Sequence, residues 1–198
     1  MSAITPAPSD AAFAPENSRT FRMGRLLLLL GVAKQDGRHV ESIDRLAYYE
    51  FFADNPWVVV ADDADSANAD RDSLRIAGFS QTQLSYASTG HRFASRRERI
   101  RGDLSQLVAY GLVRLDGVRF TVTDDGEHLA ANMQSSYADA YRVSASIVLR
   151  RLVRLSNRRL EAQVEEWIGH SWLLIDLLDD VRGADLPPET AIDESDRR

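Results

Sequence analysis

Residues 95–131 restrict the possible folds of this chain more than any other stretch. They read SRRERIRGDLSQLVAYGLVRLDGVRFTVTDDGEHLAA. An apolar stripe with the period of an α-helix runs through the first half and is formed by Ile100, Leu104, Leu107 and Val108. Gly111 follows, and glycine readily takes the left-handed conformation just past a helix end. The pattern therefore predicts an arginine-loaded helix that ends at Gly111.

The next segment has the pattern of a β-hairpin. Short alternating apolar runs flank the dipeptide Asp116-Gly117, which is typical of a two-residue turn between antiparallel strands. A turn at that dipeptide places Arg114 directly opposite Arg119, and like charges in that position destabilise a strand pair. We therefore expect an anion beside the hairpin, either a phosphate or an acidic side chain of the fold.

A further helix is expected directly after the hairpin. Asp124 is followed three residues later by Glu127, the spacing of a helix N-cap with its reciprocal acid. A helix, a two-stranded wing and another helix are typical of a winged helix. We therefore predict a mainly α fold: a winged helix-turn-helix with a small β-hairpin wing and a C-terminal helical extension.

The rest of the chain supports a division into four parts. Periodic apolar residues predict helices at 21–33 and 42–53, and Asn55-Pro56 ends the second because the residue before proline avoids the helical region. Trp57 begins an apolar run that fits a strand or a turn equally well. The expected parts are a disordered tail at 1–18, a winged-helix domain at 19–134 with a flexible acidic loop at 61–72, a helical extension at 135–184 and a disordered acidic tail at 185–198. A break in the long helical pattern is expected near Ser135-Ser136 or Ser156-Asn157.

Arginines are the main candidates for a binding surface, although the whole chain has a net charge of −6. Basic patches on an acidic protein can still attract an anionic partner. The candidate nucleic-acid-binding residues are Arg96, Arg97, Arg99, Arg101, Arg114 and Arg119. One hypothesis places the arginine-loaded helix in a DNA groove, and the other makes its arginines a solvated helix face. A second arginine run at 150–159 is open to the same two interpretations.

No motif in the sequence indicates catalysis. The chain has no cysteine and four histidines, and no histidine has a partner at the spacing of a helical metal site. Nucleotide-binding loops and hydrolase signatures are absent from the sequence. We therefore predict a protein that is not an enzyme and has no cofactor or metal. The apolar run at 26–33 is too short to span a membrane, which needs about 20 residues, so we expect no membrane association and a cytoplasmic location.

The C-terminal region carries a second candidate surface. Residues 172–181 read WLLIDLLDDV, which is apolar and acidic. The candidate partner-binding residues are Trp167, Trp172, Leu173, Leu174 and Leu177. This segment either docks on a partner subunit or packs back on the chain's own core.

Several segments resemble a known family. Residues 42–47 read SIDRLA and are followed by Phe51-Phe52 and Asn55-Pro56; together with residues 25–33 and 107–113, they resemble the middle component of ABC-three-component systems. That group overlaps the Lamassu-type anti-phage defence systems, and the similarity covers residues 21–168. The loop at 61–72 and the region after Gly169 are less typical of it.

The resemblance implies a non-enzymatic winged-helix subunit that works beside an SMC-like ABC ATPase and an effector nuclease to recognise foreign DNA. We therefore expect an accessory subunit in bacterial anti-phage or anti-plasmid defence that bridges ATPase, effector and DNA. The first alternative is a stand-alone winged-helix transcriptional regulator, dimeric through the helices after Asp124. The second is a structural adaptor without DNA contact, which the negative net charge favours.

Overall fold

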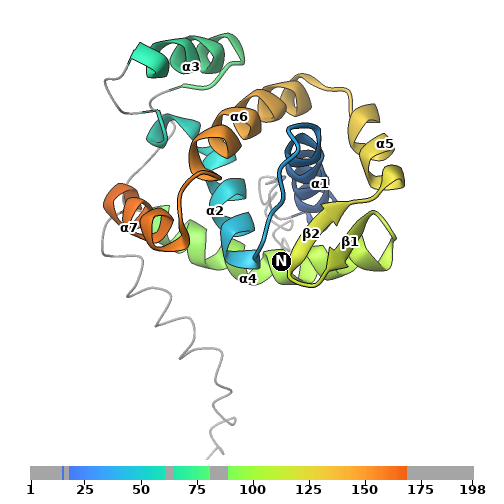
Figure 1. Cartoon of the computed structure of the whole chain (residues 1–198). Helices are drawn as coiled ribbons and strands as arrows, with labels where there is room; N and C mark the ends of the chain where they lie inside the picture. Colours follow the sequence, from blue (N-terminus) through green and yellow to red (C-terminus); the bar gives the residue numbers. More distant parts are fainter. Residues whose placement is uncertain (1–14, 16–17, 61–64, 81–88, 169–198) are drawn as a thin grey trace, which may run out of the picture.

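The computed structural model describes residue 15 and residues 18–60, 65–80 and 89–168. Over these residues the chain is mainly helical, with one two-stranded antiparallel hairpin (Figure 1). In chain order the elements are α1 Arg19–Gln35, α2 Ile43–Asp54, the short 3-10 helix η2 Pro56–Val58, α3 Asp65–Ile76, α4 Thr89–Ala109, β1 Val113–Asp116, β2 Arg119–Val122, α5 Asp124–Asn132, α6 Ser136–Leu152 and α7 Asn157–Ile168. No helix in this part of the chain is both long and apolar enough to cross a membrane.

Helix α1 is the centre of the core, as its sequence predicts. Every residue from 25 to 33 is buried, and the helix contacts α2, α4, α5, α6 and β2 (Figure 1). A helix that is apolar on most faces is stable only when neighbours cover it on several sides. Gly31 allows one of these approaches, because a Cβ at this position would lie 3.4 Å from the Cβ of Ala130 in α5.

Helix α2 begins and ends close to the predicted positions. The side chain of Ser42 accepts a hydrogen bond from the backbone N–H of Arg45, which caps the first turn. At the other end Asn55 precedes Pro56, and the chain continues as η2. The run that begins at Trp57 is therefore not a strand, and Trp57 packs with Val60 in a small second core.

The prediction of a flexible loop at 61–72 is wrong for residues 65–72, which belong to helix α3. Ala67, Asp70 and Leu74 lie on one face of this helix and are buried. Leu74 packs in the second core, and Asp70 pairs with two arginines of α6. The helix thus depends on long-range contacts that its polar composition does not reveal. Residues 61–64, and the expected edge strand at 83–88, lie outside the described residues.

Helix α4 ends as predicted, and Gly111 follows with φ +70°. The hairpin is also present, but its predicted register is wrong. Arg114 lies opposite Thr121, and Asp116 lies opposite Arg119. The two-residue turn is therefore Gly117-Val118. Gly117 has φ +63°, and glycine favours this conformation at the first position of a two-residue hairpin turn.

The hairpin is tied to the core from both sides. The backbone N–H of Phe120 in β2 donates to the carbonyl oxygen of Val40 at 3.0 Å, which gives an isolated antiparallel bridge with the α1–α2 connection. After β2, Thr123 rather than Asp124 caps α5, because its side chain accepts the N–H of Gly126. A Cβ at Gly126 would lie 2.0 Å from the carbonyl oxygen of Leu112, so only glycine permits this close contact.

Helices α6 and α7 belong to the same core as α1 and α2. The predicted break at Ser135 is confirmed, and Ser135 caps α6. Tyr141, Val148 and Leu152 of α6 and Leu160 of α7 lie in the main hydrophobic cluster. Residues 135–168 therefore complete the domain and are not an extension of it. Most of the expected tail at 1–18, all of the expected tail at 185–198 and the segment at 172–181 lie outside the described residues.

Candidate functional site

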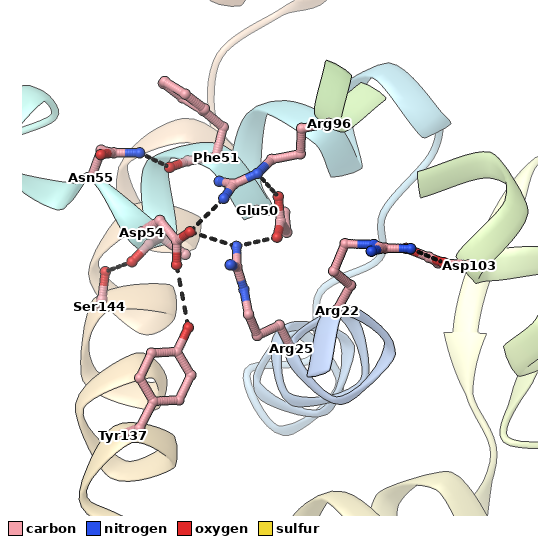
Figure 2. A network of polar contacts seen from close by, with 11 residues as sticks. Arg22, Arg25, Glu50, Phe51, Asp54, Asn55, Arg96, Asp103, Tyr137 and Ser144 are labelled. Atoms are coloured by element: carbon pink, nitrogen blue, oxygen red, sulfur yellow. Dashed lines mark hydrogen bonds and ion pairs between the residues drawn. The ribbon is translucent and has the colours of Figure 1, made fainter. Parts of the chain in front are cut away.

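Four charged side chains from three helices meet under the first half of α4. Glu50 and Asp54 stand one turn apart on α2, Arg25 comes from α1, and Arg96 comes from α4 (Figure 2). Arg96 contacts Glu50 at 3.0 Å through Nε and Asp54 at 2.6 Å through Nη2. Arg25 pairs with Glu50 and contacts Asp54 at 2.7 Å. Two positive and two negative charges thus form a neutral group, which we call the α2 ion network.

Helix α6 and aromatic rings enclose this network. The hydroxyl of Tyr137 lies 3.4 Å from Asp54, and the Ser144 hydroxyl donates to the carbonyl oxygen of Ala53 at 2.6 Å. The guanidinium of Arg25 lies 5.4 Å from the ring centroid of Tyr141. Because α1, α2, α4 and α6 all contribute, the network fixes the position of α4 on the core.

Burial shapes the protonation of these groups. Removal from water raises the pKa of Glu50, and Arg96 and Arg25 offset part of that rise. Burial also raises the pKa of Tyr141 well above its usual value. Four polar atoms here, Arg25 Nε, Glu50 Oε2, Arg96 Nη1 and Tyr141 Oη, have no hydrogen-bond partner among the described residues, although Glu50 Oε2 lies 3.0 Å from Arg96 Nε in an ion pair. Arg96, a candidate DNA-binding residue, therefore lies inside the fold.

A second ion pair holds α4 two turns further along. Asp103 is buried and accepts two hydrogen bonds from Arg22 of α1, at 2.7 and 3.1 Å. Arg19 approaches the same carboxylate at 3.6 Å. Together with Arg96, Asp103 anchors the inward side of α4 to the helices beneath it.

The opposite side of α4 is solvent-exposed and carries Arg99, Arg101, Gly102 and Ser105, which we call the outward face. A Cβ at Gly102 would have no neighbour within 4 Å, so another molecule can approach the helix backbone there. Ile100, Leu104 and Leu107 face the core as predicted, but Val108 is 39% exposed and leaves the stripe. The side chain of Arg97 lies outside the described residues.

The hairpin arginines are not in mutual conflict. Arg114 contacts Asp116 at 2.9 Å, and Asp116 is the cross-strand partner of Arg119. Asp116, at the end of β1, therefore forms an ion pair with one of these arginines and lies opposite the other. The expectation that a further anion must relieve an Arg114–Arg119 clash is wrong. Both arginines are exposed beside the C-terminal end of α4.

The second arginine run divides in the same way as the first. Arg150 and Arg151 of α6 both pair with Asp70 of α3, the latter at 2.9 Å. Arg158 and Arg159 are exposed at the start of α7. Part of the run thus fastens α3 to α6, and part faces solvent.

The aromatic candidate Trp167 packs on the protein's own core. Its ring meets that of Phe52 edge-on, with centroids 5.2 Å apart. The other partner-binding candidates, Trp172, Leu173, Leu174 and Leu177, lie outside the described residues. Among the residues that the structure describes, no group of three or more His, Asp or Glu side chains is arranged to hold a metal ion.

Sequence reasoning missed the acids that organise the site. Glu50 and Asp54 are one helical turn apart and flank the apolar residues 51–53 of α2, and Arg25 directly precedes five leucines. A charge inside an apolar stretch needs a partner when it is buried, so these positions carried a usable signal. The partners themselves were not predictable, because Arg96 lies more than forty residues further along the chain.

Comparison with known protein families finds a similarity in the second half of the chain. Residues 82–173 match the family described as ABC-three component (ABC-3C) system Middle Component 2. The match includes α4, the hairpin, α5, α6 and α7, and it supports the resemblance to the ABC-three-component middle component. It does not extend to the SIDRLA segment in α2. No curated protein and no solved structure shows significant similarity to the chain.

Proposed function

We propose that this protein is a non-enzymatic accessory subunit of an ABC-three-component system. The observation that carries the proposal is the family match over residues 82–173. Those residues include α4, whose inward side is anchored by two ion groups, and they include the hairpin. A binding subunit needs a rigid element that presents its contact residues, and α4 meets that need.

We further propose that the fold is a winged helix-turn-helix. Helix α1, the strand position at Val40, helix α2, helix α4 and the β1–β2 hairpin follow in the order of a winged helix. The bridge from Val40 to Phe120 adds the third strand position to the wing. Helix α3 is then an insertion between the second and third helices of the motif.

In this proposal the outward face of α4 and the hairpin bind DNA. Arg99, Arg101, Arg114 and Arg119 are exposed. Arginines at such positions contact phosphates or base edges, and Gly102 lets the helix approach the groove closely. Arg96 is left out of the proposed surface because its guanidinium is held by Glu50 and Asp54.

The proposed partners are an SMC-like ABC ATPase and an effector nuclease in the bacterial cytoplasm. The subunit bridges these two proteins and DNA in defence against phages or plasmids. The direct test is co-expression with the proteins encoded by neighbouring genes, followed by affinity purification and size-exclusion chromatography. We expect a stable complex that contains an ATPase with SMC-type motifs. A neighbourhood without an ATPase, or a chain that purifies alone, contradicts the proposal.

The second candidate function is a stand-alone transcriptional regulator, which the winged-helix order of the elements also favours. Gel-shift titration of the isolated protein on its own promoter region separates the two. Binding of one specific operator at nanomolar concentration and physiological salt supports the regulator. An isolated chain that binds DNA weakly and without sequence preference supports the accessory subunit, since non-specific affinities are about 10⁻⁴ to 10⁻⁶ M. A structural adaptor is expected to bind no DNA in the gel-shift titration.

A further inference from the structure

A groove of about 640 Å³ lies between α3, α6 and α7. Its apolar wall is formed by Val59, Leu152, Leu155 and Trp167. Arg150, Arg151 and Arg154 line it as well, with Asp70 as the one acid among the lining residues. The groove therefore combines an apolar wall with a net charge of two positive.

Two of the three arginines in the groove are paired with its acid. Asp70 accepts hydrogen bonds from Arg150 and Arg151. Arg154 is exposed and has no ion-pair partner among the described residues. An apolar segment with acidic residues along one edge is the occupant whose chemistry fits such a lining.

The chain contains a segment of this kind directly after α7. Residues 172–181 read WLLIDLLDDV. At the angular step of an α-helix, Asp176, Asp179 and Asp180 fall on one arc of about 100°, which also holds Trp172, and the leucines, Ile175 and Val181 fall on the rest. The segment carries three negative charges against the two positive charges of the groove.

The position of this segment also fits. Trp167, which lines the groove, is one residue before the end of α7 at Ile168. Only residues 169–171 separate α7 from the segment, and three residues span at most about 11 Å. So short a connection keeps the effective concentration of the segment near the groove in the millimolar range, so that even a weak contact is populated.

A second groove in the structure is a poorer match. It lies between α3 and the first half of α6, with Ile76, Val143 and Asp139 among its lining residues. It has no basic lining residue, and Asp139 repels an acidic segment.

We propose that residues 172–181 of the same chain dock in the groove between α3, α6 and α7, with the acidic edge toward Arg154. The inference is independent of the proposed function, because it concerns an intramolecular contact of the isolated subunit. The segment that carries the partner-binding candidates Trp172, Leu173, Leu174 and Leu177 then binds to its own chain.

Thiol crosslinking in the full chain tests this contact, and the lack of native cysteine makes the reaction site-specific. Ala69→Cys places a thiol on the α3 side of the groove, and Ile175→Cys places one in the segment. With a short bismaleimide we expect about tenfold more crosslinked monomer than for a control pair of Ala131→Cys and Ile175→Cys, as an effective concentration in the millimolar range implies. Ala131 is exposed on α5, and Figure 1 shows α5 and α7 on opposite sides of the molecule.

Equal yields for the two pairs overturn the proposal. Crosslinks that form only between chains, detected by mixing the single-cysteine variants, also overturn it and assign the groove to a second copy. Gln163→Cys, on the α7 side of the groove, replaces Ala69→Cys if the α3 variant does not fold.

Charge reversal gives an independent measure. Added to the Ala69→Cys and Ile175→Cys pair, Arg154→Glu is expected to lower the yield on the order of fivefold, the effect of one partly exposed ion pair. Arg158→Glu, an exposed arginine outside the groove lining, is expected to leave the yield unchanged. Equal effects of both reversals contradict a specific contact at Arg154.

Discussion

The two arginine-rich segments of this protein look alike in sequence and differ in the structure. In each, some arginines bind acids on another helix and others face solvent. The acid at the first segment, Glu50, is 3% exposed and its two arginine partners are largely enclosed. The acid at the second segment, Asp70, pairs with Arg151 and with Arg150, and the side chain of Arg150 is 47% exposed.

This difference in burial separates two mechanical roles. The α2 ion network joins α1, α2, α4 and α6, so it holds the centre of the domain together. The Asp70 pairs join α3 to α6 at the edge. A buried charge that loses its partner is costly because water cannot replace the lost contact. At the Asp70 site solvent reaches Arg150 and compensates for part of the loss.

The largest effect is expected from Glu50→Ala. This change leaves Arg25 and Arg96 buried beside a single remaining acid, Asp54. Urea denaturation is expected to show a loss of about 3–5 kcal/mol in the free energy of unfolding. Asp116→Ala, which removes an exposed ion pair in the hairpin, is the matched control, with an expected change below about 1 kcal/mol. Similar losses for both variants would mean that the network is not energetically buried.

Asp70→Ala is expected to cost less, about 1–2 kcal/mol, because two charged hydrogen bonds are lost at a site that solvent partly reaches. The effect should also be local. Hydrogen exchange is expected to accelerate in α3 and to stay unchanged in α4. Faster exchange in α4 would contradict the separation of the two regions.

Alkaline pH tests the network without removing one of its charges. Burial raises the pKa of Tyr141, and burial together with the nearby Asp54 raises the pKa of Tyr137. A raised folded-state pKa gives stability that is fully present below the unfolded value of about 10 and is lost as pH rises further. We expect the urea midpoint of unfolding to decrease as pH rises above about 10. The decrease is expected to be less steep in Tyr141→Phe. An identical pH profile for Tyr141→Phe would show that Tyr141 ionises normally in the folded protein.

The smallest effect on stability is expected for the exposed arginines. Arg99→Glu with Arg101→Glu changes the outward face of α4 and is expected to shift the free energy of unfolding by about 1 kcal/mol or less, most of it from Arg99, whose charge acts on Glu50. Thermal melts of this variant and of Arg158→Glu with Arg159→Glu should therefore be close to those of the wild type. A large shift in the first variant alone would place its arginines in the fold rather than on a binding surface.

Local signals in the sequence predicted most of the helices. Gly111, the dipeptide Asn55-Pro56 and Ser135 mark helix ends through backbone preferences that need no tertiary information. The five leucines at 26–30 predicted a central helix because no exposed helix is apolar on so many faces.

Features that depend on long-range contacts were not predictable. The sequence of helix α3 has the acidic composition of a loop. The helix is held by the pairs of Asp70 with two arginines about eighty residues further along the chain, which local sequence does not reveal. The hairpin register depends on whether the two turn residues are Asp116-Gly117 or Gly117-Val118. Both pairs are favoured in two-residue hairpin turns, so the sequence does not decide between them. Nothing in the local sequence distinguishes Arg96 from Arg99 and Arg101. Arg96 points into the fold because it pairs with Glu50 and Asp54.

The measurement that tests the proposed binding surface most directly is a salt titration of DNA affinity. Fluorescence anisotropy with a labelled duplex would compare the wild type, Arg99→Glu with Arg101→Glu, and Arg158→Glu with Arg159→Glu. If the outward face of α4 binds DNA, the first variant loses affinity and its slope against log salt falls by about 0.9 for each lost phosphate contact, while the second variant keeps the wild-type slope. Equal slopes and affinities for all three proteins would contradict a DNA-binding role for the outward face of α4.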